Sequence, residues 1–347
     1  MKTRGSLAVA LDAMGGDHAP TTTVQGAVEA VRLHGIQVLV VGRESTLRRE
    51  LARLGGAPPG LHIVDAPEVV GMSDSPTAPL RSKRNSSLAV GMRLLRDGLA
   101  SAFVTAGNTG AAMVTAKLTL GMIEGVERPA LASLVPGYDH QTLLLDVGAN
   151  VDCKPRHLAQ FAVMGHFYAE QVLGKTRPRI GLLSVGEEEG KGDRVTQDAY
   201  RILSESGLNF IGNVEGRDVY SGTVDVVVCD GFVGNVVLKV SEGLGEMVFK
   251  LLRREAKRSP LSAAGFLLAK GAFTGFRRQV DYAEYGGAPL LGVRGACLVG
   301  HGRSNARAIR NALRFAHSYA ARDVIHHIER KIAELTARQD AEETGGP

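Results

Sequence analysis

The sequence predicts an α/β fold: a Rossmann-like, mostly parallel sheet with helices on both faces. Short apolar runs, several of them β-branched, recur along the chain, and most end in glycine or an acidic residue, as buried strands do. Amphipathic stretches with helical spacing separate these runs, so strand, glycine turn and helix alternate. In such a sheet the ligand lies beyond the carboxyl ends of the strands, where this sequence is densest in Asp, Gly, Asn and Thr.

Six runs are expected to form strands, and four of the stretches between them are expected to form helices. The strands are residues 7–11, 38–41, 102–104, 142–145, 180–183 and 224–228. The helices are residues 24–33, 47–54, 88–95 and 159–173. The chain has 347 residues, 44% of them hydrophobic, which suffices for one large core or two linked ones. We predict one large domain over residues 1–335 and a disordered tail at 336–347, where the residues are polar and small.

One stretch departs from this alternation. An amphipathic segment runs from Ser241 to Arg258, and an apolar segment follows it after a Ser-Pro pair. Residues 250–278 carry eight Lys or Arg against one acid, Glu255. We predict that a protruding helical hairpin is inserted into the domain here, at about residues 245–280.

The composition narrows the classes of partner. A net charge of +5 favours an acidic protein, a phosphate-bearing substrate or an anionic membrane surface. An aromatic content of 5%, without a finger, basic-zipper or ribonucleoprotein motif, argues against nucleic acid. Cys153, Cys229 and Cys297 are isolated and lack metal-ligand spacing, which indicates a reducing cytoplasm and no metal. No signal peptide is visible and no run nears the ~20 apolar residues of a spanning helix, so we expect a cytoplasmic protein.

Two small-residue turns follow predicted strands. Gly15-Gly16-Asp17 follows residues 7–11, and paired glycines let backbone N–H groups close on an oxyanion at the start of a helix. The alternative is a tight turn in which Asp17 or a threonine caps the helix. Gly107-Asn108-Thr109 follows residues 102–104 and fits either a phosphate cradle or a capped helix packed closely on the sheet.

Three further segments carry a polar side chain in a glycine-rich turn. Lys191 lies in residues 186–193, which form either a solvated loop or a hinge from which its ammonium reaches a phosphate or a developing oxyanion. Asn235 follows the strand at 224–228 and can donate two N–H bonds to a carbonyl oxygen. His301 lies between two glycines ahead of a helix, so we expect an exposed ring rather than a core histidine.

Motifs of other enzyme classes fail to match. Residues 169–176 resemble a Walker loop, but Ala169 stands where the first glycine belongs and the segment has a helical pattern. No dinucleotide-binding Gly-x-Gly-x-x-Gly follows a strand, and no Gly-x-Ser-x-Gly nucleophile elbow is present. The cysteines are explained as small packing residues. The sequence therefore requires neither a cofactor nor a covalent intermediate.

Taken in order, these segments are distinctive. The chain closely resembles the acyl-carrier-protein:phosphate acyltransferases of bacterial phospholipid synthesis, the PlsX family. The matching segments, spread over residues 7–330, are 12–20, 72–87, 106–111, 146–150, 186–192, 213–218, 230–242, 285–292 and 301–302. One departure is Ser184-Val185, where the family pattern has a more polar, Asn-containing run, and it leaves the local shape near Lys191 open.

The resemblance implies a reaction and a set of partners. It implies that long-chain acyl carrier protein donates the acyl group, that inorganic phosphate accepts it, and that acyl phosphate is made for phospholipid synthesis. It also implies a homodimer, no metal, no cofactor, and a glycerol-3-phosphate acyltransferase as the downstream partner. The family's fold looks related to those of phosphate acetyltransferases and isopropylmalate dehydrogenases.

This chemistry assigns expected roles to the polar turns. We expect Lys191 and Asn235 to face the thioester carbonyl and the phosphate. His301 either protonates the departing thiolate or orients the phosphate. Asp12 and Asp17 are expected to hold loops in place, since bare carboxylates repel phosphate. The candidates for binding phosphate are Gly15, Gly16, Asp17, Gly107, Asn108, Thr109, Lys83 and Ser304.

The predicted hairpin suits an acidic carrier protein and an anionic membrane surface. Each basic residue near such a surface is worth about 1 kcal/mol before screening. The expected contacts are Arg253, Arg254, Lys257, Arg258, Phe266, Leu267, Leu268, Phe273, Arg277 and Arg278. The alternative is that the same apolar face forms the dimer interface. We therefore expect a cytoplasmic protein with peripheral membrane association.

Two other functions stay open. A short-chain phosphate acyltransferase that uses acyl-coenzyme A would share the phosphate site, although the basic patch favours carrier protein. A non-catalytic scaffold that binds carrier protein at the membrane would have no need for an anion pocket. A dehydrogenase is disfavoured because the dinucleotide motif is missing.

Overall fold

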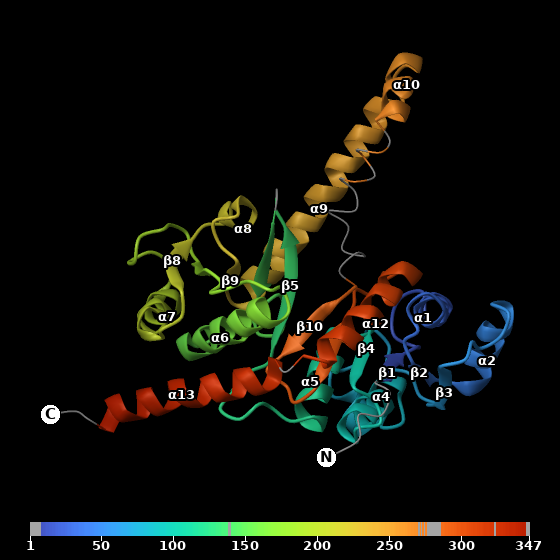
Figure 1. Cartoon of the computed structure of the whole chain (residues 1–347), viewed down its shortest axis with the longest axis horizontal. Helices are drawn as coiled ribbons and strands as arrows, with labels where there is room; N and C mark the ends of the chain where they lie inside the picture. Colours follow the sequence, from blue (N-terminus) through green and yellow to red (C-terminus); the bar gives the residue numbers. More distant parts are fainter. Residues whose placement is uncertain are drawn as a thin grey trace.

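One mixed sheet forms the centre of the molecule (Figure 1). The computed structural model describes residues 8–137, 140–269, 271, 273, 275, 286–322 and 324–344, with side chains as far as residue 334. In this part the strand order is β3-β2-β1-β4-β11-β10-β5-β6-β9-β7-β8. The strands are β1 (Val9–Asp12), β2 (Val38–Gly42), β3 (Leu61–Asp65), β4 (Ala102–Thr105), β5 (Ala130–Pro136), β6 (Gln141–Leu145), β7 (Ile180–Leu183), β8 (Phe210–Val214), β9 (Val226–Val228), β10 (Ala288–Leu291) and β11 (Ala296–Val299). All six predicted strands are present.

Helices cover both faces of the sheet. They are α1 (Thr21–His34), α2 (Glu44–Arg53), α3 (Ala78–Arg81), α4 (Ser87–Arg96), α5 (Thr109–Thr119), α6 (Pro155–Gln171), α7 (Arg194–Glu205), α8 (Asp218–Ser221), α9 (Gly231–Ala256), α10 (Pro260–Leu268), α12 (Ala306–Ala320) and α13 (Val324–Thr344). One buried apolar cluster joins the sheet to α1, α6 and α12, and another joins it to α4 and α5. The predicted fold class, a Rossmann-like and mostly parallel sheet with helices on both faces, is therefore confirmed.

Two parallel groups of strands flank an antiparallel centre. β10 pairs antiparallel with β11 and β5, and β5 pairs antiparallel with β6. Val299, at the end of β11, pairs with Ala288 in β10, and Leu145, at the end of β6, pairs with Ala132 in β5. The two groups run in opposite directions, yet the carboxyl ends of both meet at the central strands β10 and β5. Because ligands bind at carboxyl ends, this register brings both groups to one site.

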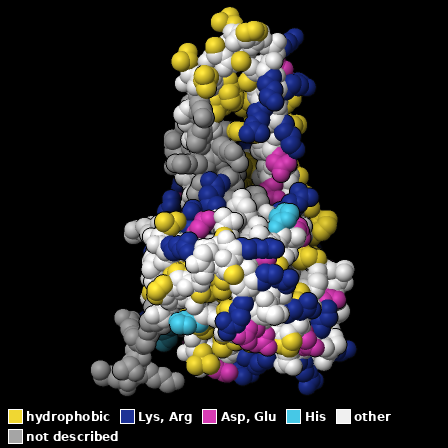
Figure 2. All heavy atoms as spheres, turned by 90° about the vertical axis from the view of Figure 1, so that its right-hand side faces the viewer, with side chains coloured by type: hydrophobic (Ala, Val, Ile, Leu, Met, Phe, Trp, Pro, Cys, Tyr) yellow, Lys and Arg dark blue, Asp and Glu magenta, His cyan; other side chains and the backbone are white. Residues whose placement is uncertain are grey.

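Helix α9 leaves the body of the molecule and carries α10 at its far end (Figure 1). It begins at Gly231, before the predicted hairpin boundary at 245, because the Asp230 carboxylate accepts bonds from the first backbone N–H groups. Hydrophobic side chains gather at the far end, with Lys and Arg along the helix (Figure 2). Leu261 and Leu268 there are 84% and 90% exposed. The predicted contacts Arg277 and Arg278 lie outside the described residues.

The carboxyl-terminal helix differs from its prediction. We expected disorder from residue 336, but α13 continues to Thr344. Residues 333–344 are rich in Ala, Glu, Arg and Gln, which are polar or small but favour helix. In the part of the chain that the structure describes, we find no helix with the length and apolar character needed to cross a membrane.

Candidate active site

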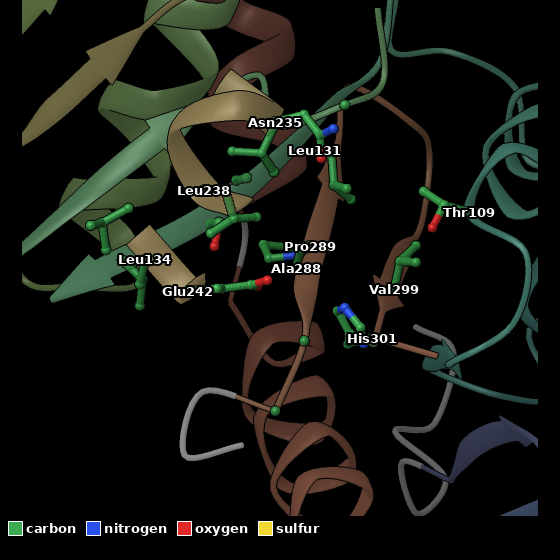
Figure 3. A pocket seen from close by; sticks show the side chains of 18 of the residues that line it. Thr109, Leu131, Leu134, Asn235, Leu238, Glu242, Ala288, Pro289, Val299 and His301 are labelled. Carbon is green, nitrogen blue, oxygen red and sulfur yellow. The ribbon is translucent and has the colours of Figure 1, made fainter. Parts of the chain in front are cut away.

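A cavity of about 930 Å³ opens where the two groups of strands meet (Figure 3). Asn235, Leu238 and Glu242 of α9 lie on one side of β10, and Thr109 and His301 lie on the other (Figure 3). The polar part of the lining also includes Asp17, Gly107, Gly302, Ser304 and Lys239. The apolar part includes Leu131, Leu134, Leu238, Leu244, Val248 and Phe315. The lining thus combines polar and apolar side chains, and α9 contributes both kinds.

Asp12 holds the first two glycine turns together. Its carboxylate accepts a 2.8 Å hydrogen bond from the Thr105 hydroxyl and one of 3.2 Å from the Met14 backbone N–H. Burial raises the pKa of the Asp12 carboxyl, and the bonds from Ser87 and Thr105 oppose that rise. A Cβ at Gly15 would lie 2.6 Å from this carboxylate, so only glycine fits there. Asp12 therefore acts as the loop-holding residue that we expected.

A third turn completes this wall. The backbone N–H of Asp17 donates to the Gly302 carbonyl at 2.8 Å, and that of Gly300 donates to the Thr105 carbonyl at 2.7 Å. The turns after β1, β4 and β11 are therefore bonded into one unit. Gly107, Thr109, His301 and Ser304 of this unit line the cavity, together with Asp17.

Gly15, Gly16 and Asn108 lie behind the lining residues rather than among them. The Asn108 side chain caps α5: its oxygen accepts a 3.0 Å bond from the Ala111 N–H. Its nitrogen donates to the carbonyls of Met72 and Asp74 at 3.0 and 3.1 Å. The capped-helix alternative thus describes Asn108 in this structure.

Lys83 is also absent from the cavity lining. Its ammonium donates to the Val69 carbonyl at 2.8 Å and forms an ion pair with Asp74. The hydrogen bond from Lys83 lowers the pKa of the Asp74 carboxyl. Lys83 therefore fastens the segment that Asn108 also holds, and this segment contributes Met72 to the cavity.

The opposite wall is the amino end of α9. Gly234 packs so tightly that a Cβ there would lie 1.8 Å from the Asp146 carbonyl oxygen. The Asp146 carboxylate in turn accepts backbone bonds from Leu131, Ala149 and Asn150 at 2.7–3.0 Å. This packing fixes the first turn of α9 and with it Asn235, which lines the cavity.

His301 adopts a defined tautomer. Its Nδ1 accepts a 3.1 Å hydrogen bond from the Arg303 backbone N–H, so the proton of the neutral ring is on Nε2. Burial lowers the pKa of His301, and the positive charges of Lys239 and Arg303 lower it further. The half-buried ring is therefore suited to donating a hydrogen bond in its neutral form.

Lys239 and Glu242 are cavity residues to which the sequence assigned no role in the site. Both lie on α9, four and seven residues beyond Asn235, and the Lys239 ammonium contacts the Glu242 carboxylate at 2.8 Å. A spacing of four and seven residues places side chains on one helix face. That spacing was the available signal, because Asn235 had already been assigned to the site.

Lys191 lies elsewhere. It is an exposed residue of the turn between β7 and α7, and it is absent from the cavity lining. Its backbone N–H donates to the Glu188 carbonyl at 3.0 Å, and that carbonyl also accepts from the Asn213 side chain at 2.8 Å. The structure therefore does not bring Lys191 together with Asn235 and His301, and its role stays a prediction.

The cavity can stabilise negative charge without a metal. Helices α5, α9 and α12 all begin at its lining, and helix amino ends carry partial positive charge. Across the described residues, no group of three or more His, Cys, Asp or Glu is placed to hold a metal ion.

Solved structures of low sequence identity share the fold. A phosphotransacetylase from Streptococcus pyogenes matches with a TM-score of 0.62 at 16% identity, covering 91% of this chain and 94% of that one. The EutD phosphotransacetylase from Staphylococcus aureus matches with a TM-score of 0.60 at 14% identity and the same coverage. A 4-hydroxythreonine-4-phosphate dehydrogenase from Klebsiella pneumoniae matches with a TM-score of 0.54 at 15% identity, covering 91% of this chain and all of that one.

Sequence relatives extend over almost the whole chain. A family model described as "Fatty acid synthesis protein" matches residues 7–327. The phosphate acyltransferase of Trichlorobacter lovleyi is 52% identical over 326 residues, 94% of both chains. That of Pelotomaculum thermopropionicum is 49% identical over 332 residues, 95% of this chain and 96% of the relative. On this evidence of identity and coverage, the chain belongs to the phosphate acyltransferase family of enzymes.

Proposed function

We propose that the protein transfers a long-chain fatty acyl group from the thioester of acyl carrier protein to inorganic phosphate. A phosphate oxygen attacks the thioester carbonyl, the new C–O bond forms and the C–S bond breaks. The proton of hydrogen phosphate ends on the departing sulfur, so the products are acyl phosphate and the free carrier thiol. Phosphate is already a nucleophile at neutral pH, so the reaction needs no activated serine or cysteine.

The observation that carries this proposal is one cavity whose lining combines polar and apolar side chains. Transfer requires both reactants in one place, and such juxtaposition is worth at best about 7–11 kcal/mol. The apolar lining residues, among them Leu131 and Leu134 from β5 and Val248 from α9, suit an acyl chain. Each buried CH₂ of the chain contributes about 0.8 kcal/mol to the binding free energy, so these residues favour a long chain over an acetyl group. This preference therefore argues against the short-chain alternative.

Uncharged hydrogen-bond donors in the cavity can stabilise the negative charges of phosphate and of the tetrahedral intermediate. Thr109 at the start of α5 and the Ser304 turn ahead of α12 are suited to hold phosphate. Asn235 and the Nε2–H of His301 face the cavity from opposite walls and are suited to the oxyanion of the tetrahedral intermediate. One such donor is typically worth about 3–4 kcal/mol. This role differs from the two expected for His301, which were to protonate the departing thiolate or to orient the phosphate. Hydrogen-bond donation fits its tautomer better than protonation of the thiolate.

The α9–α10 projection supports a proposal about partners. Five basic residues follow each other closely along α9 and just beyond it: Lys250, Arg253, Arg254, Lys257 and Arg258. Such a stretch suits an acidic carrier protein, and the exposed leucines of α10 suit an anionic membrane surface. We include in this proposal a homodimer, a cytoplasmic protein that associates peripherally with the membrane, and transfer of the product to a glycerol-3-phosphate acyltransferase.

The test is formation of acyl phosphate from palmitoyl-carrier protein and inorganic phosphate, with palmitoyl-coenzyme A in parallel. Fast turnover with the carrier protein alone is the expected result. Turnover with coenzyme A alone would make the protein a different phosphate acyltransferase. The absence of turnover with either donor would favour the non-catalytic scaffold and end the proposal.

A further inference from the structure

An ion pair lies inside the cavity. Lys239 and Glu242 line it from α9, and their ammonium and carboxylate groups are 2.8 Å apart. The two side chains remain 48% and 27% exposed, so a ligand in the cavity can reach both. An exposed pair at this spacing stabilises a helix by only a few tenths of a kcal/mol. The stability that the Lys239–Glu242 pair adds to α9 is therefore too small to explain why the pair lies in the cavity.

The side-chain donors described above carry no full positive charge to balance the negative charge of phosphate. Thr109, Asn235 and neutral His301 are all uncharged. Among the described residues that line the cavity, two have a Lys or Arg side chain: Lys239 and Arg314. Arg314 lies far along α12 and acts electrostatically on His34, at the end of α1.

Lys239, in contrast, acts across the polar part of the cavity. Its charge acts on His301, on which Glu242 and Asp17 also act. Lys239, Glu242, Asp17 and His301 all line the cavity, so Lys239 is the cation that α9 contributes to it. Asp17 and Glu242 are its carboxylates.

We propose that Lys239 binds the phosphate acceptor and that Glu242 is a positioning residue that holds the Lys239 ammonium in the cavity. This inference rests on the proposed function, because it assumes that phosphate enters this site. An ammonium has three donors, so it can keep one bond to Glu242 and direct others to phosphate. The carboxylate also repels the bound anion, which weakens phosphate binding and favours product release.

The proposal predicts opposite effects for the two members of the pair. Lys239→Met removes the charge but keeps the stem, and should raise KM for phosphate about 10- to 100-fold, as for loss of a charged hydrogen bond. Glu242→Gln keeps an acceptor for Lys239 but removes the repulsion, and should lower KM for phosphate. A pair that served only to stabilise α9 would shift both variants in the same direction.

The experiment measures kcat and KM for phosphate at saturating acyl carrier protein, together with the rise in melting temperature that phosphate produces. Lys331→Met is the matched control, because Lys331 forms a pair at the same spacing with Glu334 on α13, outside the cavity. We expect the control to match the unmodified protein. Melting temperatures without phosphate show whether each variant folds.

The outcomes separate this inference from the proposed function. If Lys239→Met folds and keeps its KM and its thermal response to phosphate within twofold, Lys239 is not the phosphate site. If Glu242→Gln raises KM, repulsion by Glu242 does not weaken phosphate binding and that part of the proposal is wrong. If phosphate stabilises the unmodified protein and not Lys239→Met, the site stands even where no acyl transfer is seen. In that case only the proposed reaction fails.

Discussion

At the scale of single residues, one hydrogen-bonded histidine lines the cavity, and two buried carboxylates outside the lining hold the loops around it. Asp12 and Asp146 accept backbone bonds from turns on opposite walls, and neither lines the cavity. His301 is held by the Arg303 backbone N–H and presents its other nitrogen as a donor. The residues that hold the site and those that face the reactants are thus largely different.

The role of His301 as a neutral donor can be tested by substitution. We expect His301→Ala to lower kcat about 10²- to 10³-fold, as for the loss of an oxyanion donor. His301→Gln retains an N–H donor and should keep several-fold more activity than the alanine variant. Because the pKa of His301 is lowered, its neutral form persists below the ordinary value near 6.5, and the acid limb of kcat/KM should lie there. A glutamine variant as inactive as alanine would instead favour proton transfer.

Lys191 is the residue whose predicted role most needs a measurement. If its turn approaches the reactants during catalysis, Lys191→Ala should lower kcat/KM for acyl carrier protein about 10²-fold, since a charged donor to the oxyanion is lost. Arg194→Ala is the control, because Arg194 is a 94% exposed cation at the start of the next helix. Near-normal turnover of Lys191→Ala would remove Lys191 from the mechanism.

At the scale of elements, ion pairs between side chains join the amino ends of β7 and β9, which lie away from the site. The Asp225 carboxylate ahead of β9 contacts Arg179 ahead of β7 at 2.9 Å and Lys175 at 3.2 Å. Burial opposes ionisation, but the bonds from Arg179 and Lys175 outweigh it and lower the pKa of Asp225 to about 2. This contact joins two neighbouring strands where their chain segments enter the sheet.

Asp225 should make the protein less stable in acid. Its pKa is depressed in the folded state, so its contribution is present above the unfolded pKa of about 3.9 and is lost as pH falls toward 2. Asp225→Asn should therefore lower the free energy of unfolding by at most about 2 kcal/mol at pH 7, and by much less near pH 2.5. Urea unfolding at both pH values measures this, with Asp198→Asn on the exposed face of α7 as control. A loss that does not depend on pH would contradict the assignment.

At the scale of the whole molecule, the antiparallel strands β10 and β5 join two parallel groups, and α9 extends from the joint into solvent. The cavity therefore draws residues from the first, middle and last thirds of the chain: Thr109, Leu131 and His301. Charged and apolar side chains are separated along the projection, with basic residues on α9 and leucines at its end (Figure 2).

The end of the projection should bind membrane if our proposal about partners is right. Phe266→Glu/Leu267→Glu should abolish flotation with vesicles of anionic lipid, because the acidic side chains oppose both burial and the surface charge. Leu99→Glu, at a residue 64% exposed on the body of the molecule, is the control. Unchanged flotation rules out the tip, and a change from dimer to monomer on sedimentation would favour the interface alternative.

The sequence predicted the strands with β-branched, continuous apolar runs, and these were found. It missed β10, whose Ala-Pro-Leu-Leu contains a proline, and β3, in which His62 interrupts the apolar run. It also missed β5, β8 and β11. The turns after β1, β4 and β9 were identified because small and polar residues follow a predicted strand there. The turn after β11 was identified because His301 lies between two glycines ahead of a helix. The position of Lys191 could not be predicted, because it depends on strand order: β9 separates β7 from β6 and from the centre.

Helix α9 also sets a length. Its 26 residues, at about 1.5 Å each, span about 39 Å from Gly231, at the cavity, to Ala256, in the projection. Because α9 is one continuous helix, a partner that binds at its far end is held at a distance from His301 that the helix length sets. A donor held there must present its acyl group on an arm long enough to cover that span. A small thioester that diffuses freely, such as acyl-coenzyme A, meets no such requirement. The length of the arm that carries the acyl group can therefore distinguish this donor from acyl carrier protein.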